Sequence, residues 1–187
     1  MYGPIHTLDV LNIRTVLAVT GVLVLLGFLT WGLVNKGESG LAEGEPVPTS
    51  TLTTLPPGGE TSLAEYRGDW VLMNVWASWC IPCRKESPAL DEFEAKYRDK
   101  VTVLGVDTRD LSEDAMNFIE EYGLKYAQAR DASGNYADDL KTTGVPESFL
   151  VDPEGNLVAH YAGPFRDLES IEKFAAPALE AQGASTK

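Results

Sequence analysis

Two cysteines, Cys80 and Cys83, are the only ones in the 187-residue chain, and two residues separate them. They follow an apolar run of strand-forming residues at 70–76 (WVLMNVW) and open a segment of helical pattern at 80–99. A thiolate at a helix N-terminus faces unpaired N–H groups and the positive end of the helix dipole, which lower its pKa. The spacing also places the second sulfur within disulfide reach. The pattern therefore predicts a redox-active pair, with Cys80 as the exposed nucleophile and Cys83 as the resolving thiol.

Two other roles for this cysteine pair have little support in the sequence. A purely stabilising disulfide across so short a loop would constrain the unfolded chain very little. A zinc site needs further ligands, and the two histidines, His6 and His160, lie far apart in sequence. Pro82 lies in the first helical turn, where its missing N–H costs nothing. We therefore expect neither a metal nor a bound cofactor, and a redox-active Cys80–Cys83 disulfide instead.

One carboxylate falls on the apolar face of the helix that follows the cysteines. Residues Cys83, Glu86, Leu90, Phe93 and Tyr97 are spaced 3, 4, 3 and 4 apart, so they share one side of that helix. Burial would raise the pKa of the Glu86 carboxyl and make it a candidate proton acceptor for the neighbouring thiol. The alternative is a partly exposed glutamate paired with a lysine or arginine.

The rest of the chain alternates short apolar runs with helical segments. Strands are predicted at residues 49–55, 61–63, 70–76, 101–107, 126–130, 148–152 and 157–161. Helices are predicted at residues 80–99, 112–122, 136–142 and 167–181. This order predicts an α/β fold, with a central mixed sheet, helices on both of its faces and an N-terminal β-hairpin.

An uncharged stretch of 20 residues, 15–34, precedes this domain. As a helix it would extend about 30 Å, the thickness of the hydrocarbon core of a bilayer. The stretch is longer than the core of a signal peptide and no clear cleavage site follows it, so a retained transmembrane anchor is expected. Arg14 favours an N-in orientation, with the folded domain on the extracytoplasmic (periplasmic) side of the cytoplasmic membrane. The predicted layout is a tail at 1–14, the anchor at 15–34, a linker at 35–45, a domain at 46–181 and a tail at 182–187.

The composition is that of a globular protein, with 44% apolar and 23% charged residues. Lys and Arg number 15 and Asp and Glu number 28, which gives a formal net charge of 15 − 28 = −13. Such an acidic surface repels phosphate backbones, so nucleic acid is excluded as a partner.

Residues 75–88 (VWASWCIPCRKESP) resemble the active-site segment of the thioredoxin superfamily. More narrowly, they resemble the membrane-anchored TlpA/ResA/CcmG (DsbE) group of thiol-disulfide oxidoreductases. Residues 144–152 (GVPESFLVD) are similar to the segment that carries this family's cis-proline. The resemblance implies a thioredoxin-like fold and a cis Val145–Pro146 peptide bond that faces the cysteines and binds an incoming substrate strand.

The resemblance also implies roles for several neighbours of these motifs. Trp79, from its place beside the cysteine pair, is expected to form part of the substrate-contacting surface, with a core tryptophan as the alternative. Pro82 and Val145 are expected to contribute to the same surface. Glu147 resembles a second acidic residue of the CcmG branch, although a solvated loop charge is an equal alternative. Asn74 stands where thioredoxins have a buried aspartate, so Glu86 would have to supply the general base.

On this resemblance the protein reduces disulfides in partner proteins, with apocytochrome c as the expected substrate during cytochrome c maturation. A membrane electron donor of the CcdA/DsbD type would re-reduce the cysteine pair. Two alternatives remain: a general disulfide oxidant of exported proteins, and a copper-delivery protein that would need His160 as a third ligand.

Overall fold

The computed structural model describes the backbone of residues 13–34 and 40–184, and the side chains of 15–31 and 40–181. The chain forms two compact units that divide after residue 38. Most of the predicted N-terminal tail, residues 35–39 of the predicted linker and the last three residues lie outside the described parts.

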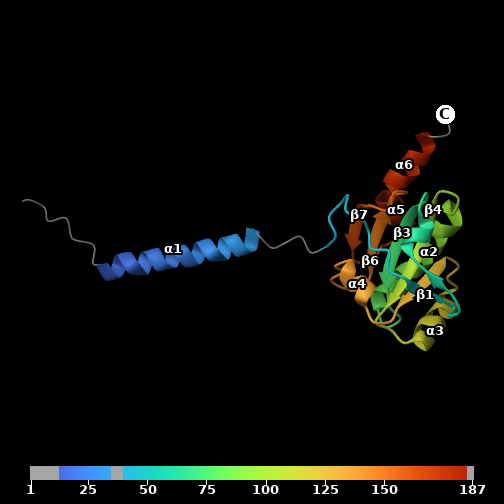
Figure 1. The fold of residues 1–187 in the computed structure, drawn as a ribbon, viewed down its shortest axis with the longest axis horizontal. Coiled ribbons are helices and arrows are strands. Elements are labelled where there is room, and N and C mark those ends of the chain that lie inside the picture. The colour runs from blue at the N-terminus through green and yellow to red at the C-terminus, as the bar shows by residue number, and fades with distance from the viewer. Residues whose placement is uncertain (1–12, 35–39, 185–187) are drawn as a thin grey trace, which may run out of the picture. The chain divides into compact units, whose positions relative to one another are not determined.

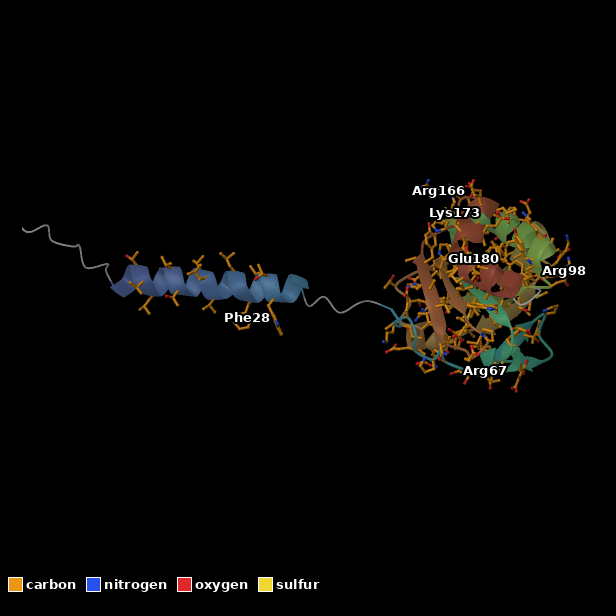
Figure 2. All side chains as sticks on the ribbon, turned by 90° about the horizontal axis from the view of Figure 1, so that it is seen from above. Phe28, Arg67, Arg98, Arg166, Lys173 and Glu180 are labelled. Atoms are coloured by element: carbon orange, nitrogen blue, oxygen red, sulfur yellow. A yellow bond between two sulfur atoms is a disulfide. The ribbon has the colours of Figure 1, made fainter. Side chains whose placement is uncertain are left out.

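The first unit contains one helix, α1 (Ile13–Val34), with 22 residues (Figure 1). Its described side chains are exposed and project from all sides of the helix, as Figure 2 shows around Phe28. Judged on the described residues alone, none of the helices has the length and hydropathy of a membrane span.

The second unit is an α/β fold built on one seven-stranded sheet (Figure 1). Its strands are β1 (Leu52–Leu55), β2 (Glu60–Thr61), β3 (Trp70–Trp76), β4 (Val101–Thr108), β5 (Ala127–Asp131), β6 (Glu147–Val151) and β7 (Leu157–Ala162). They lie in the order β2-β1-β5-β4-β3-β6-β7. The central strands β3, β4 and β5 are parallel and the remaining neighbours pair antiparallel. The predicted mixed sheet and the β1–β2 hairpin are therefore confirmed.

Helices cover both faces of this sheet, as predicted. They are α2 (Ile81–Tyr97), α3 (Ser112–Tyr122), α4 (Asn135–Asp139), α5 (Leu168–Phe174) and α6 (Ala176–Ala184), with a 3-10 turn at Leu63–Tyr66. Side chains alternate across β3 because successive residues of a strand point to opposite faces. Leu72 and Trp76 pack with α2, α3 and α5, while Val71 and Met73 pack with α4 on the other face. Asn74 shares the face of Leu72, which directs it toward α2.

The C-terminal segment differs from the single helix predicted at 167–181. The structure has two helices, α5 and α6, that meet at Ala175. Pro177 explains the break, because proline has no N–H to donate and its ring clashes with the carbonyl of Lys173 in a continuous helix. At the other end, the Asp167 carboxylate caps α5 by accepting from the Ser170 N–H at 2.9 Å.

The predicted linker also ends earlier than expected. The Gly44 N–H donates to the Leu157 carbonyl at 2.7 Å, and the Leu157 N–H donates to the Glu45 carbonyl at 2.9 Å. Strand β7 lies at the edge of the sheet, where unpaired backbone groups need partners. Gly44 and Glu45 supply those partners at the start of β7, and residues 40–45 belong to the folded unit.

Candidate functional site

Cys80 and Cys83 form a disulfide at the N-terminus of α2. Cys80 is the N-cap residue, and its sulfur accepts from the Cys83 N–H at 3.1 Å. We expected Cys80 to be exposed, but it is 3% exposed in this oxidised state and Cys83 is 1% exposed. The disulfide explains the difference, because it folds the Cys80 side chain back over the first turn of the helix. Ile81 and Pro82, in that first turn, are exposed.

The turn that leads into Cys80 is held from both sides. The Ser78 N–H donates to Asp110 Oδ2 at 2.5 Å. The Arg84 guanidinium donates to the Ser78 carbonyl through Nε at 3.1 Å and Nη2 at 2.9 Å. Sequence reasoning missed both partners. A signal existed for Asp110, since it follows the strand predicted at 101–107, and parallel strands of one sheet end at the same edge.

Glu86 lies on the buried side of α2 and is 1% exposed. Its Oε1 accepts from Asn74 Nδ2 at 3.0 Å and its Oε2 accepts from the Phe165 N–H at 2.9 Å. Burial raises the pKa of Glu86 to about 7, against the opposing effect of these two hydrogen bonds. The predicted burial is therefore correct, and the alternative of an exposed, ion-paired glutamate is wrong.

The Val145–Pro146 peptide bond is cis. Strand β6 begins directly after it, and Glu147 pairs with Val75 of the neighbouring strand β3. This register places Pro146 next to the end of β3. Strand β3 ends at Trp76, four residues before Cys80. The sheet thus places the cis-proline loop and the cysteine turn at the same edge.

Glu147 is buried, which differs from the expected contact with substrate and from a solvated loop charge. Its Oε1 accepts from the Thr143 N–H at 2.7 Å, the Thr143 hydroxyl at 2.7 Å and the Gly144 N–H at 3.0 Å. Its Oε2 lies 2.7 Å from Nε2 of His160. The carboxylate is fully occupied by the chain itself, so it holds the loop in front of Pro146.

Removing this carboxylate should destabilise the folded unit. Glu147→Ala would remove the shared acceptor of the Thr143, Gly144 and His160 donors. Water can reach these exposed or partly buried groups, so we expect a cost of about 2 kcal/mol. Urea unfolding of residues 39–187 measures this loss, with exposed Glu154→Ala as the matched control. Equal unfolding free energies for the two variants would contradict the positioning role.

A pocket of about 280 Å³ lies between the two active-site loops. Trp79 lines it from the cysteine turn, and residues 142–145 line it from the cis-proline loop. The Trp79 indole donates to the Arg109 carbonyl at 3.3 Å and is 58% exposed. Trp79 and Val145, which precede Cys80 and Pro146 in the chain, therefore line the same pocket.

The copper alternative finds no support in this arrangement. His160 lies on β7, and its Nε2 is 2.7 Å from Oε2 of Glu147. Its ring stacks on Phe149 with the ring centroids 4.6 Å apart. Within the described residues no group of histidine, cysteine and carboxylate side chains could hold a metal ion.

A disulfide closed across the first turn of a helix, on a sheet of this order and beside a cis-proline loop, is the arrangement of thioredoxin-like thiol-disulfide oxidoreductases. The chain belongs to the AhpC/TSA family, whose sequence model matches residues 44–160. Two relatives narrow the class further. The chain is 31% identical to the thiol-disulfide oxidoreductase ResA of Bacillus cereus, with 80% of this chain and 86% of the relative covered. It is 34% identical to the thiol:disulfide interchange protein DsbE of Xylella fastidiosa, with 78% and 76% covered.

A solved structure agrees with these relatives. The thioredoxin domain of a thiol-disulfide oxidoreductase from Bacteroides vulgatus is 34% identical and superposes with a TM-score of 0.63, with 72% of this chain and 98% of that one covered. The protein is thus a thiol-disulfide oxidoreductase of the ResA/DsbE type.

Proposed function

We propose that the protein is a membrane-anchored, extracytoplasmic protein-disulfide reductase that acts on the cysteines of apocytochrome c. One observation carries the thiol-disulfide exchange: a buried carboxyl, Glu86, lies one helical turn from Cys83 with a pKa of about 7. Such a group is ionised often enough near neutral pH to accept the proton of the resolving thiol. The ResA and DsbE relatives support the same class of chemistry.

The reductive cycle begins with both cysteines as thiols. The Cys80 thiolate attacks one sulfur of the substrate disulfide, forms a mixed disulfide and releases the other substrate sulfur as a thiolate. Glu86 accepts the Cys83 proton, and the Cys83 thiolate then attacks the Cys80 sulfur. The Cys80–Cys83 disulfide forms and the second substrate sulfur leaves as a thiolate. Two electrons have passed to the substrate, and the oxidised pair seen in the structure is the product state.

The anchor and the electron donor complete this proposal. The proposed anchor is the uncharged stretch 15–34, which lies within helix α1. It would hold the catalytic unit close to a membrane electron donor of the CcdA/DsbD type, which would return two electrons to the Cys80–Cys83 disulfide.

The reduction potential of the Cys80–Cys83 pair tests the direction of electron flow. We expect a value near that of thioredoxin, about −270 mV, when residues 39–187 are equilibrated against glutathione or dithiothreitol. This fragment is a compact unit with its own core. A value near that of the strong oxidant DsbA, about −120 mV, would overturn the proposal and favour a disulfide donor. The two reference potentials differ by about 7 kcal/mol for the transfer of two electrons. A Cys80→Ser, Cys83→Ser double variant provides the baseline.

A further inference from the structure

Three charged side chains meet beneath the turn that carries the cysteines. Asp107 lies near the end of β4, where it pairs with Trp76 of β3 on one side and with Arg130 of β5 on the other. Asp110 follows in the next loop. Asp107 has no exposed surface and Asp110 is 9% exposed. The sheet therefore fixes this cluster at the edge where the active-site turn begins.

Asp107 lacks the donors that a buried carboxylate needs. Neither of its oxygens accepts a hydrogen bond from any described residue. The nearest cation is Arg130, whose Nε lies 3.6 Å from Asp107 Oδ2, longer than a charge-assisted hydrogen bond. A buried ionised carboxylate without donors is costly. The neutral acid avoids this cost, because its own O–H can donate to a neighbour.

Asp110 is the neighbour that can accept this proton, because the Arg130 guanidinium contacts both residues, with Nε near Asp107 Oδ2 and Nη2 on the Asp110 carbonyl. Two carboxyl groups can bond only when one of them keeps its proton. Burial raises the pKa of Asp107 to about 8, and the nearby charges of Asp110 and Asp131 add to this against the opposing effect of Arg130.

The same Asp110 carboxylate holds the active-site turn. Its Oδ2 accepts from the Ser78 N–H, two residues before Cys80, and its Oδ1 accepts from the Leu111 N–H at 2.8 Å. Arg130 Nη2 donates to the Asp110 carbonyl at 2.6 Å. A proton on Asp107 is therefore one hydrogen bond away from the group that positions Ser78.

We propose that Asp107 and Asp110 share one proton, and that this proton keeps the Asp110 carboxylate on the Ser78 amide and the Cys80 turn in its reactive position. Asp107 is thus a positioning residue that acts on Cys80 through Asp110 and Ser78. Loss of the proton sets two carboxylates against each other, and the repulsion displaces Asp110 from Ser78. The added negative charge also disfavours the Cys80 thiolate. This inference holds for either direction of electron flow.

The pH dependence of Cys80 alkylation tests the coupling. The reduced full chain is held in detergent with Cys83→Ser, so that Cys80 alone reacts with iodoacetamide. Adding Asp107→Asn, which is neutral at every pH, should leave the rate constant unchanged at pH 6 and raise it about threefold at pH 9 relative to the parent. Exposed Glu169→Gln is the matched control. Identical pH profiles with and without Asp107→Asn would overturn the proposal.

A second measurement reads the proton itself and does not depend on how well the Asp107 variant folds. In the full chain with Glu86→Gln, which removes the other strongly shifted carboxyl, infrared spectra at pH 7 should show the carbonyl stretch of a protonated carboxylic acid. The band should disappear as the pH passes about 8. Asp110→Asn should move this loss to lower pH. Absence of the band at pH 7 in the Glu86→Gln chain would refute the shared proton.

Discussion

The substitution Cys83→Ser is expected to leave Cys80 joined to its substrate by a stable mixed disulfide. The nucleophilic attack by Cys80 is unchanged, but no second thiol remains to resolve the intermediate. Turnover should fall by at least about a thousandfold, since covalent catalysis stops halfway. Non-reducing electrophoresis followed by mass spectrometry of the adducts measures the trapped species and identifies its partner.

The controls for this trap separate the chemistry from the proposed location. Cys80→Ser, Cys83→Ser should form no adduct, because the attacking sulfur is missing. Adducts of the full chain should fractionate with membranes, whereas those of residues 39–187 should be soluble. Trapping without any cytochrome-type partner would refute the substrate proposal but leave the exchange mechanism intact. Absence of every adduct would contradict the mechanism itself.

Glu86→Gln is expected to slow the resolving step about a hundredfold at pH 8, since it removes the base that accepts the Cys83 proton. In the unchanged protein this step should accelerate as the pH rises through about 7, because Glu86 accepts a proton only when ionised. The variant should lose that inflection. Stopped-flow measurement of substrate release from the Cys80 mixed disulfide gives both quantities. Exposed Glu92→Gln on the same helix is the matched control.

The Glu86 carboxyl should also make the free energy of unfolding depend on pH. Its pKa is raised from 4.5 to about 7 on folding, so the folded chain keeps this proton where the unfolded chain has lost it. The contribution of the neutral acid is complete below pH 4.5 and is lost as the pH rises to about 7, by about 3 kcal/mol. Glu86→Gln should remove that decline from urea unfolding. An unchanged decline would contradict the raised pKa and, with it, the role of Glu86 as base.

Local patterns in the sequence were sufficient to find the redox pair and its supporting helix. Helix periodicity depends on residues three and four apart, so the spacing of Cys83 and Glu86 already placed both on one face. The apolar runs at 70–76 and 101–107 likewise depend on near neighbours, and these strands occur as predicted. The overlooked proline at 177 is also a local signal, and it broke the last helix where a single one was expected.

Only the tertiary structure decided what surrounds the pair. The acceptor for the Ser78 amide comes from Asp110, 32 residues away, and one donor to Glu86 comes from Phe165, 79 residues away. Such partners are set by strand order and register, and no local periodicity encodes them. The same reason applies to Glu147, which in sequence could be a surface charge, but which the pairing of β6 between β3 and β7 buries against His160. The sequence by itself thus determined the two cysteines, the helix that carries them and the buried carboxyl beside them. The packing of the sheet determined which groups contact these residues and the turn before them.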